Sequence, residues 1–419
     1  MSSQDLPKPD YAYNLKIIGH SDQGGRPDGV QLMVNKEYAI TGHMFSDGFS
    51  VIDVRDPRNP KPVHYEPSAP NTWNIHLQTA GDLMLVINAK NMFAAEEFQN
   101  EAEYYSGQIG KKVGTADAEQ PRERNWKAGM TVYNIANPAE PKEIAFMPVD
   151  GGGIHRLWYT GGDWAYASVL LDGFTDYIFM TIDISDPTKP KEAGRYWLPG
   201  MNAAAGEMPD DASRRGGLHH AIIHGDRAYG AWRDAGLVIM DISDRTNPTL
   251  ITHKNWSPPY GGGTHNALPL PDRDLLIVAD EAVLDHAADG IKYIWVFDIR
   301  EPKNPVSIAT FPTPDDADYV AKGGHFGPHN IYENRPDGLV SSDTIYSTYQ
   351  NAGVRVFEIS NAYQPKEVAA FVPPEPVTLA DKRPNRQKVI QSCDVWVSKD
   401  GLVYTNDFNG GLCILEYGG

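Results

Sequence analysis

The sequence predicts an all-β protein, a seven-bladed β-propeller of four-stranded antiparallel blades that spans residues 1–419 as a single domain. Three observations predict this fold: an internal repeat, a composition rich in turn residues, and an N-terminal segment that matches a strand missing from the last repeat. The 419 residues include 39 Gly and 32 Pro, which favours many turns over long helices.

The repeat is the strongest of these signals. Its core is an apolar strand, a turn built on Asp or Asn and Pro, and a second strand, as in "IDISDPTKPKEA" from Ile182. The first acidic residue of the core recurs at Asp183, Asp241 and Asp298, at intervals of about 58 residues. Two further strand-like runs precede each core. Each repeat is therefore predicted to form one four-stranded antiparallel meander.

The N-terminal segment can supply a strand that the last repeat lacks. The last copy of the repeat, "CILEYGG", is truncated, whereas the N-terminus carries an additional strand-like run, "YNLKIIGH", from Tyr13 to His20. We predict that this N-terminal strand completes the last blade, because radial closure protects the edges that open sheets expose.

The repeat resembles the LVIVD-repeat family of β-propellers. The best match to the family signature is "GLVIMDISD", from Gly236 to Asp244, and each predicted blade carries some version of it. The resemblance implies the propeller fold over nearly the whole chain. It implies little about chemistry, because the family hosts several roles.

One segment interrupts the repeat. Residues 91–129, within the second predicted blade, contain Ala, Glu and Gln with spaced Phe and Tyr, which predicts a short helix followed by a polar loop. Insertions at this point emerge where the innermost strands begin. The insertion is therefore interpreted either as a tolerated surface loop or as a lid over the mouth of the central channel.

Charge and composition exclude several partners. The formal net charge is −18, which argues against binding nucleic acid or an anionic membrane, since phosphate contacts need clustered Lys and Arg. No apolar run is long enough to span a bilayer. The N-terminus lacks the features of a secretory signal and only Cys393 and Cys413 are present, so the expected location is cytoplasmic.

Histidines recur at one position of the predicted innermost strands. Alignment of five consecutive blades places there the histidines that we predict to be metal ligands: His76, His155, His220, His265 and His329. One such histidine is ordinary in a repeat, but five that converge on one axis favour a divalent transition metal, Mn, Fe or Zn, with copper less favoured. Because side chains alternate along a strand, His219 is expected to point away from His220 and to be structural.

A second ring of polar residues is predicted at the ends of the neighbouring strands. Its predicted catalytic residues are Glu281, Asp407 and Arg233. Its predicted substrate-binding residues are Arg233, Lys90, Tyr349, Gln350 and His43. A ring of imidazoles beside acidic, basic and guanidinium groups is typical of the mouth of an active site.

Together the two rings favour a metal-dependent lyase or hydrolase whose small-molecule substrate is a carboxylate or an aromatic acid. The metal would polarise a substrate oxygen, Glu281 or Asp407 would move a proton, and Arg233 would bind a carboxylate. Two alternatives remain open. One is a non-haem Fe(II) or copper oxygenase or oxidase, by architectural analogy with the four-histidine carotenoid-cleaving oxygenases. The other is a non-catalytic propeller that binds proteins; the substrate, the metal and the oligomeric state are not determined by the sequence.

Overall fold

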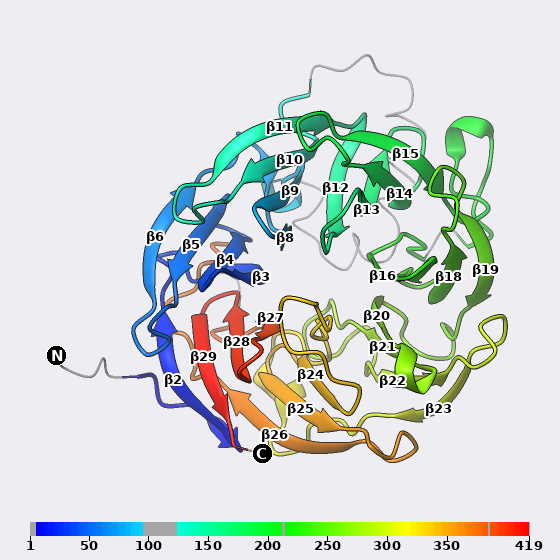
Figure 1. Cartoon of the computed structure of the whole chain (residues 1–419). Coiled ribbons are helices and arrows are strands. Elements are labelled where there is room, and N and C mark those ends of the chain that lie inside the picture. The colour runs from blue at the N-terminus through cyan, green and yellow to red at the C-terminus, as the bar shows by residue number, and fades with distance from the viewer. Residues whose placement is uncertain (1–5, 95–123, 212–213, 384–385, 419) are drawn as a thin grey trace.

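The computed structural model describes residues 6–94, 124–211, 214–383 and 386–418. In this part of the chain, antiparallel sheets stand around a central axis in a propeller-like ring (Figure 1). The helices are short: η1 (Met92–Ala94), η3 (Ala203–Ala205), η4 (Pro271–Arg273) and α3 (Tyr319–Lys322). No helix within the described ranges has the length and apolarity needed to cross a membrane. The predicted all-β, propeller-like architecture is confirmed.

Among the described residues, three of the sheets are simple meanders of four strands in sequence order. The first comprises β3 (Gly29–Asn35), β4 (Tyr38–His43), β5 (Phe49–Asp53) and β6 (Lys61–Glu66). The second comprises β16 (His220–His224), β17 (Arg227–Ala231), β18 (Leu237–Asp241) and β19 (Thr249–Lys254). The third comprises β20 (Thr264–Leu270), β21 (Leu275–Asp280), β22 (Ile294–Asp298) and β23 (Val306–Thr310).

A nine-stranded sheet lies between the first and second meanders. Its first strands are β7 (Thr72–Trp73), β8 (Leu77–Ala80), β9 (Leu83–Lys90), β10 (Gly129–Asn134) and β11 (Lys142–Pro148). Its remaining strands are β12 (Gly151–Trp158), β13 (Trp164–Leu171), β14 (Ile178–Asp183) and β15 (Lys191–Tyr196). The two groups are joined through a single pair of residues, Gly153 and Ala89, on β12 and β9.

The N-terminal segment is part of two sheets. β2 (Leu15–Ser21) pairs with the C-terminal strand β29 (Gly411–Tyr417), which follows β27 (Ser392–Val397) and β28 (Leu402–Asp407). β1 (Tyr11–Tyr13) pairs with β26 (Lys366–Val372), beside β25 (Val354–Glu358) and β24 (Thr344–Thr348). The pairing of β2 with β29 is the predicted one, whereas the pairing of β1 was not anticipated. Residues 11–21 therefore supply the outer strands of two sheets that are otherwise built from the C-terminal part of the chain.

The turn in each repeat has a local physical cause. The carboxylate that ends the third strand accepts a hydrogen bond from the backbone N–H two residues later, at 3.0 Å from Asp183 to Ser185 and at 2.8 Å from Asp241 to Ser243. This side chain closes the turn in place of a backbone group. The Asp or Glu of the repeated motif is therefore a turn residue.

The third strands supply much of the core. β18 (sequence LVIMD) is buried at its four apolar positions, because both faces of the sheet pack against neighbouring sheets. The outer strands are more exposed, as in β6. The inner strands contact one another around the axis: β3 touches β8 and β27, and β16 touches β12 and β20. Residues near the starts of these inner strands therefore face a shared central space.

One inner segment differs from the predicted regular meander. Residues 326–332, which precede β24, make isolated bridges in place of a strand, although His329 N–H donates to the Thr348 carbonyl oxygen at 3.0 Å. Pro328 has no N–H to donate and restricts the residue before it, which interrupts the ladder at this point. The fourth strand of this sheet is supplied instead by β1 on the outer side.

We predict that deleting residues 1–21, which removes β1 and β2, lowers the melting temperature strongly and causes aggregation. Two sheets would lose their outer strands, and the unpaired edges of β26 and β29 would be exposed. Circular dichroism melts and size-exclusion chromatography measure the effect. Deleting only residues 1–8, which form no strand among those described, is the matched control. An unchanged melt and a monomeric profile for the longer deletion would contradict this account of closure.

Candidate metal and substrate site

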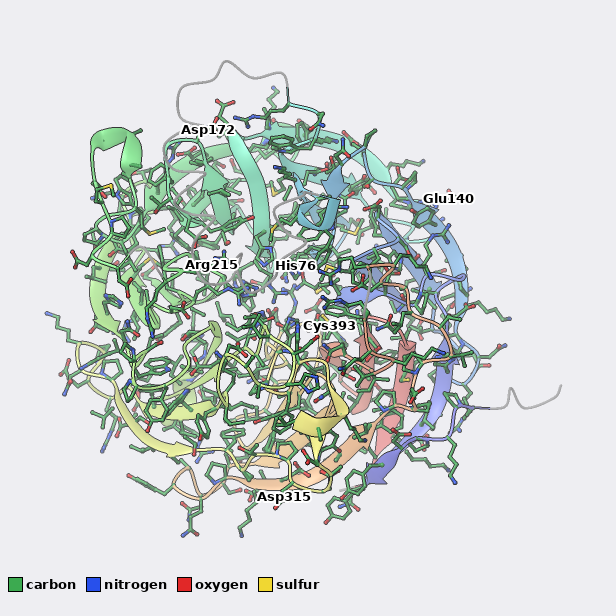
Figure 2. All side chains as sticks on the ribbon, turned by 180° about the vertical axis from the view of Figure 1, so that it is seen from behind. His76, Glu140, Asp172, Arg215, Asp315 and Cys393 are labelled. Atoms are coloured by element: carbon green, nitrogen blue, oxygen red, sulfur yellow. The ribbon has the colours of Figure 1, made fainter. Side chains whose placement is uncertain are left out.

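A cavity of about 140 Å³ lies at the axis of the ring. His76, Arg215 and Cys393 lie near the centre, whereas Glu140, Asp172 and Asp315 lie toward the rim (Figure 2). Imidazoles line one part of the cavity, and aromatic and guanidinium groups line the rest. Small-molecule sites commonly have this composition, with a mainly apolar wall and a few polar groups that converge.

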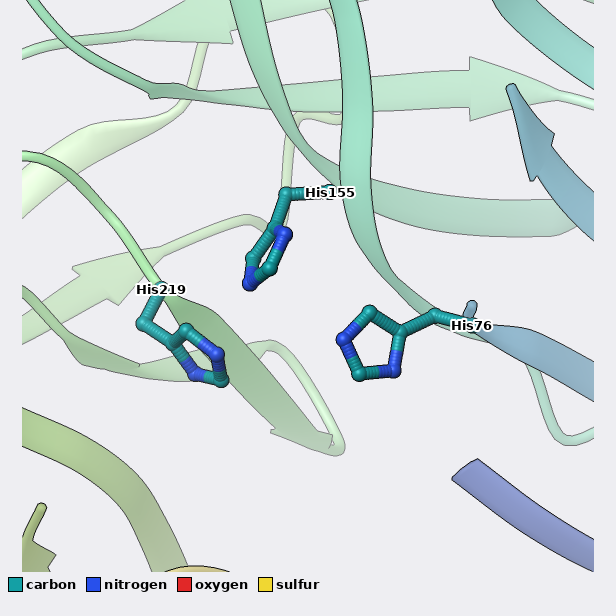
Figure 3. Close-up of side chains that lie close together, drawn as sticks. All are labelled: His76, His155 and His219. Atoms are coloured by element: carbon teal, nitrogen blue, oxygen red, sulfur yellow. The ribbon is translucent and has the colours of Figure 1, made fainter. Parts of the chain in front are cut away.

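Five imidazoles form an arc in this cavity. Their ring centroids are separated by 4.9 Å from His76 to His155 and by 4.8 Å from His155 to His219. The arc continues at 3.6 Å from His219 to His265, whose rings are stacked, and at 4.5 Å from His265 to His329. Figure 3 shows His76, His155 and His219 turned toward one another. The predicted convergence of histidines on the axis is therefore present, with one change of residue.

The change concerns the histidine pair at the start of β16, His219 and His220. The alignment assigned the axial position to His220 and a structural position to His219, but the structure places His219 in the cavity and His220 away from it, 2.8 Å from Glu333 Oε1. In β12 and β20 the ladder register shifts at His155 and His265, so that these residues bulge out of the pairing. β16 has no such bulge, and the residue just before its first ladder pair takes the axial position. Side chains alternate strictly only along a strand without bulges, so the expected orientations of His219 and His220 were wrong.

His265, Glu281 and His329 converge on one point. The Nε2 atoms of His265 and His329 each lie 3.4 Å from an oxygen of the Glu281 carboxylate. His329 Nδ1 lies 2.5 Å from the carbonyl oxygen of Cys393, and His265 Nδ1 lies 2.9 Å from Asn266 Oδ1. A carbonyl oxygen only accepts, so the Nδ1 of His329 carries the ring proton and its Nε2 carries a lone pair.

Burial and a neighbouring positive charge shift the pKa values of the three residues in this cluster. It lowers the pKa of His265 well below its ordinary value, and it lowers the pKa of His329, so both rings are neutral at pH 7. Burial alone would raise the pKa of Glu281, but the Arg233 guanidinium outweighs it and holds that pKa well below its usual range. The site thus presents two imidazole lone pairs and one carboxylate to a shared point, which is the ligand set of many divalent metal sites.

A buried polar network lies next to the arc. Arg156, which is 1% exposed, donates to His76 Nδ1 at 3.1 Å and to Glu333 Oε1 at 2.8 Å. Burial would raise the pKa of Glu333, but His220, Arg156 and Arg335 lower it to about 2. His220 therefore serves as a partner of a buried carboxylate, and no signal in the repeat pattern pointed to Arg156 or Glu333.

Only some residues of the predicted second ring line the cavity. Arg233, Glu281 and Gln350 line the cavity, and Arg233 is paired with the carboxylate of Glu281. Arg233 lowers the pKa of Glu281, whereas a general base near neutral pH needs a raised pKa, so its role as the base stays a prediction. The remaining predicted residues, His43, Lys90, Tyr349 and Asp407, do not line the cavity.

Each of these four residues has another environment. His43 Nε2 lies 2.7 Å from Ser50 Oγ and its Nδ1 lies 3.4 Å from Asp28, a buried array without access to the cavity. Asp407 accepts the backbone N–H groups of Asn409 and Gly410, both at 2.8 Å, and so closes a turn. Tyr349 is buried near Phe326, at 5.7 Å between ring centroids, and Lys90 is exposed beside Trp126.

Loop residues outside the repeat complete the cavity wall. Arg215 is held by two hydrogen bonds to Asp176, at 3.2 and 3.0 Å, and Arg383 is held likewise by Asp381. His325 Nε2 lies 3.5 Å from Asp285 Oδ1. Residues 95–123 of the predicted helix and lid lie outside the described residues, but Met92 and Phe93, at the start of that insertion, line the cavity.

We predict that His220→Ala destabilises the fold more than His219→Ala does. Loss of His220 removes a partner from buried Glu333, which should lower the free energy of unfolding by about 1–3 kcal/mol, whereas His219 faces the cavity. The ionised Glu333 contributes stability above its unfolded pKa, near 4.5, and this is lost as the pH falls toward 2. His220→Ala should therefore also shift acid unfolding to higher pH. Urea titrations at pH 7 and pH 4 measure both effects, and equal losses in the two variants would show that His219 and His220 are placed wrongly.

Comparisons with known proteins agree with the fold. No curated protein sequence matches the chain. Among solved structures, it is similar to U3-55K at 8% identity and a TM-score of 0.57, covering 98% of this chain and 100% of that one. It is also similar to the Cps50 (Swd1) β-propeller domain of Myceliophteria thermophila at 10% identity and a TM-score of 0.51, covering 96% and 98%. At such identities the likeness concerns the fold alone.

A family model gives the more specific result. The model described as LVIVD repeat matches residues 173–197 and 221–255. The second match contains the segment "GLVIMDISD", on which the resemblance was based. The chain therefore carries LVIVD repeats, as its sequence predicted.

Proposed function

We propose that this protein is a metal-dependent enzyme that binds a divalent transition metal through His265, Glu281 and His329 and acts on a small organic anion. The supporting observation is the donor set itself. Two neutral imidazoles, of which His329 commits its only proton to a carbonyl oxygen, face an ionised carboxylate at 3.4 Å. Lone pairs that face one another without a proton between them repel, and a cation at the shared point removes that repulsion.

The overall arrangement that we propose is seven-bladed. Strands β8–β11 and β12–β15 each form an antiparallel run of four, and only the Gly153–Ala89 pair connects β12 to β9. We interpret the nine-stranded sheet as two blades joined at their inner ends. This interpretation puts the metal site at the axis, where inner strands from several blades meet.

The charge of the cavity wall favours an anionic substrate. Four guanidinium groups, those of Arg215, Arg233, Arg383 and Arg386, line the cavity against three carboxylates, those of Glu281, Asp285 and Asp381. A divalent metal would add two further positive charges. Arg215 is oriented by Asp176 and is the residue that we assign to the substrate carboxylate, since Arg233 already pairs with Glu281.

The metal, when bound, would supply a Lewis acid that polarises a substrate oxygen. Glu281 would serve as its ligand, so proton transfer is assigned to another group. His325 lines the same cavity and is oriented by Asp285, at 3.5 Å from its Nε2. We assign the proton-transferring role to His325, which suits lyase or hydrolase chemistry.

An oxygenase is the second candidate. Two histidines and one carboxylate form the facial ligand set of non-haem Fe(II) oxygenases as well as that of hydrolytic zinc sites. Metal identity separates the candidates. Zinc or manganese without O₂ consumption would support the lyase or hydrolase, whereas iron with substrate-dependent O₂ consumption would support the oxygenase.

We predict that His265→Ala and Glu281→Gln each weaken binding of Zn²⁺ or Mn²⁺ by at least about 100-fold, because each removes a direct ligand. Equilibrium dialysis followed by elemental analysis, on protein purified without a His-tag, measures the affinity. His224→Ala, on the exposed end of β16, is the matched control and should bind like the wild type. Wild-type affinity in Glu281→Gln would contradict the proposed ligand set.

We predict that His325→Gln reduces turnover by about two to four orders of magnitude while metal content is retained, because the variant loses the proton-transferring group and no metal ligand. A turnover substrate can be sought by screening small carboxylic acids against the metal-loaded enzyme. Arg215→Lys should instead raise KM more than it lowers kcat, since a bidentate contact becomes a single one. Full turnover in His325→Gln would remove this residue from the chemistry.

A further inference from the structure

We propose that His76 and His219 bind a substrate hydroxyl group beside the metal, so that the preferred substrates are hydroxycarboxylic acids. The inference rests on the proposed metal-dependent function, whose substrate class it narrows. Nitrogen atoms of His76, His155 and His219 lie within 4.8 Å of one another. That spacing alone would also suit a second metal, so the position of the ring proton on His76 and on His219 decides between a metal and a hydroxyl group.

The proton of His76 is placed by Arg156. The Arg156 guanidinium lies 3.1 Å from His76 Nδ1, and a guanidinium has donors only. His76 Nδ1 must therefore accept, and the neutral ring carries its proton on Nε2. A doubly protonated ring would set two N–H donors against each other, so the same contact disfavours the imidazolium form.

Arg156 cannot easily turn away from this contact. It is 1% exposed and also donates to Glu333 Oε1 at 2.8 Å, and Glu333 in turn lies 2.8 Å from His220 Nε2. The buried series from His220 through Glu333 and Arg156 to His76 thus fixes one tautomer of His76. Arg156 is a positioning residue, because it acts on the cavity through His76.

His219 carries its ring proton on the other nitrogen, Nδ1. Its Nδ1 lies 2.9 Å from the backbone carbonyl oxygen of His265, which only accepts. Nδ1 therefore carries the proton, and Nε2 presents a lone pair. His76 offers a donor to the cavity, whereas His219 offers an acceptor.

A metal ion does not fit this pair, because binding through His76 Nε2 would require that nitrogen to lose its proton while Arg156 still occupies Nδ1. A hydroxyl group does fit, since it accepts one hydrogen bond and donates another. It would accept from His76 Nε2–H and donate to His219 Nε2. The stacking of His219 on His265, with centroids 3.6 Å apart, places this hydroxyl site directly next to the metal ligands.

Matched ligand pairs test the proposal on the Zn²⁺-loaded protein. Isothermal titration calorimetry would compare lactate with propionate, and 2-hydroxybenzoate with benzoate. We expect the hydroxy acid to bind at least about tenfold more tightly in at least one pair, because the acid without a hydroxyl leaves a buried donor and acceptor unpaired. Equal binding within both pairs would overturn the proposal.

Variants separate this inference from the proposed function. His76→Phe removes the donor but keeps a ring, and His219→Ala removes the acceptor. Each should abolish the hydroxyl preference while zinc content stays at one ion per chain, and His224→Ala should change neither. Two zinc ions per wild-type chain, or loss of zinc in His76→Phe, would overturn the inference and leave the metal-dependent function standing. Absence of Zn²⁺, Mn²⁺ and Fe²⁺ binding in the wild type would instead reject the proposed function.

Discussion

Closure of the ring is the constraint on which the remaining structure depends. Inner strands can surround one axis only if the first and last sheets meet, and that contact is made by β2 on β29 and strengthened by β1 on β26. The central cavity exists because of this closure. A residue that would occupy an exposed edge in an open sheet is instead surrounded by neighbours, which explains how a set of polar side chains comes to be almost fully buried.

Burial then determines the chemistry available to those side chains. A buried imidazole loses its charge more readily than an exposed one, and each nitrogen of a neutral ring must be matched to a donor or an acceptor. Backbone carbonyl oxygens of His265 and Cys393 match the Nδ1 protons of His219 and His329. Arg156 imposes the opposite tautomer on His76. Histidines that look equivalent in the sequence therefore have different functions available to them.

This division also explains what the sequence could and could not predict. The repeat predicted the meanders, because the Asp turn and the apolar third strand are local features, and it predicted the terminal pairing, because one strand was missing at one end and available at the other. It placed His76, His155, His265 and His329 at the axis. It missed His219, since a bulge shifts side-chain direction by one residue without any change in composition. It also missed Arg215 and Arg383, which lie in loops outside the repeat.

The role of Glu281 shows why contacts are needed to assign function. In the sequence, a lone glutamate in a ring of polar residues indicates a general base, and a buried base near another carboxylate would have a raised pKa. In the structure, the Arg233 guanidinium pairs with it and lowers that pKa. Asp280, its neighbour in sequence, carries the raised pKa, about 6, because burial raises it by more than the hydrogen bonds from the indole N–H groups of Trp256 and Trp295 lower it. A carboxylate that faces a metal and the Arg233 guanidinium is a weak base, so we assign the proton transfer to a residue of the cavity wall outside the cluster.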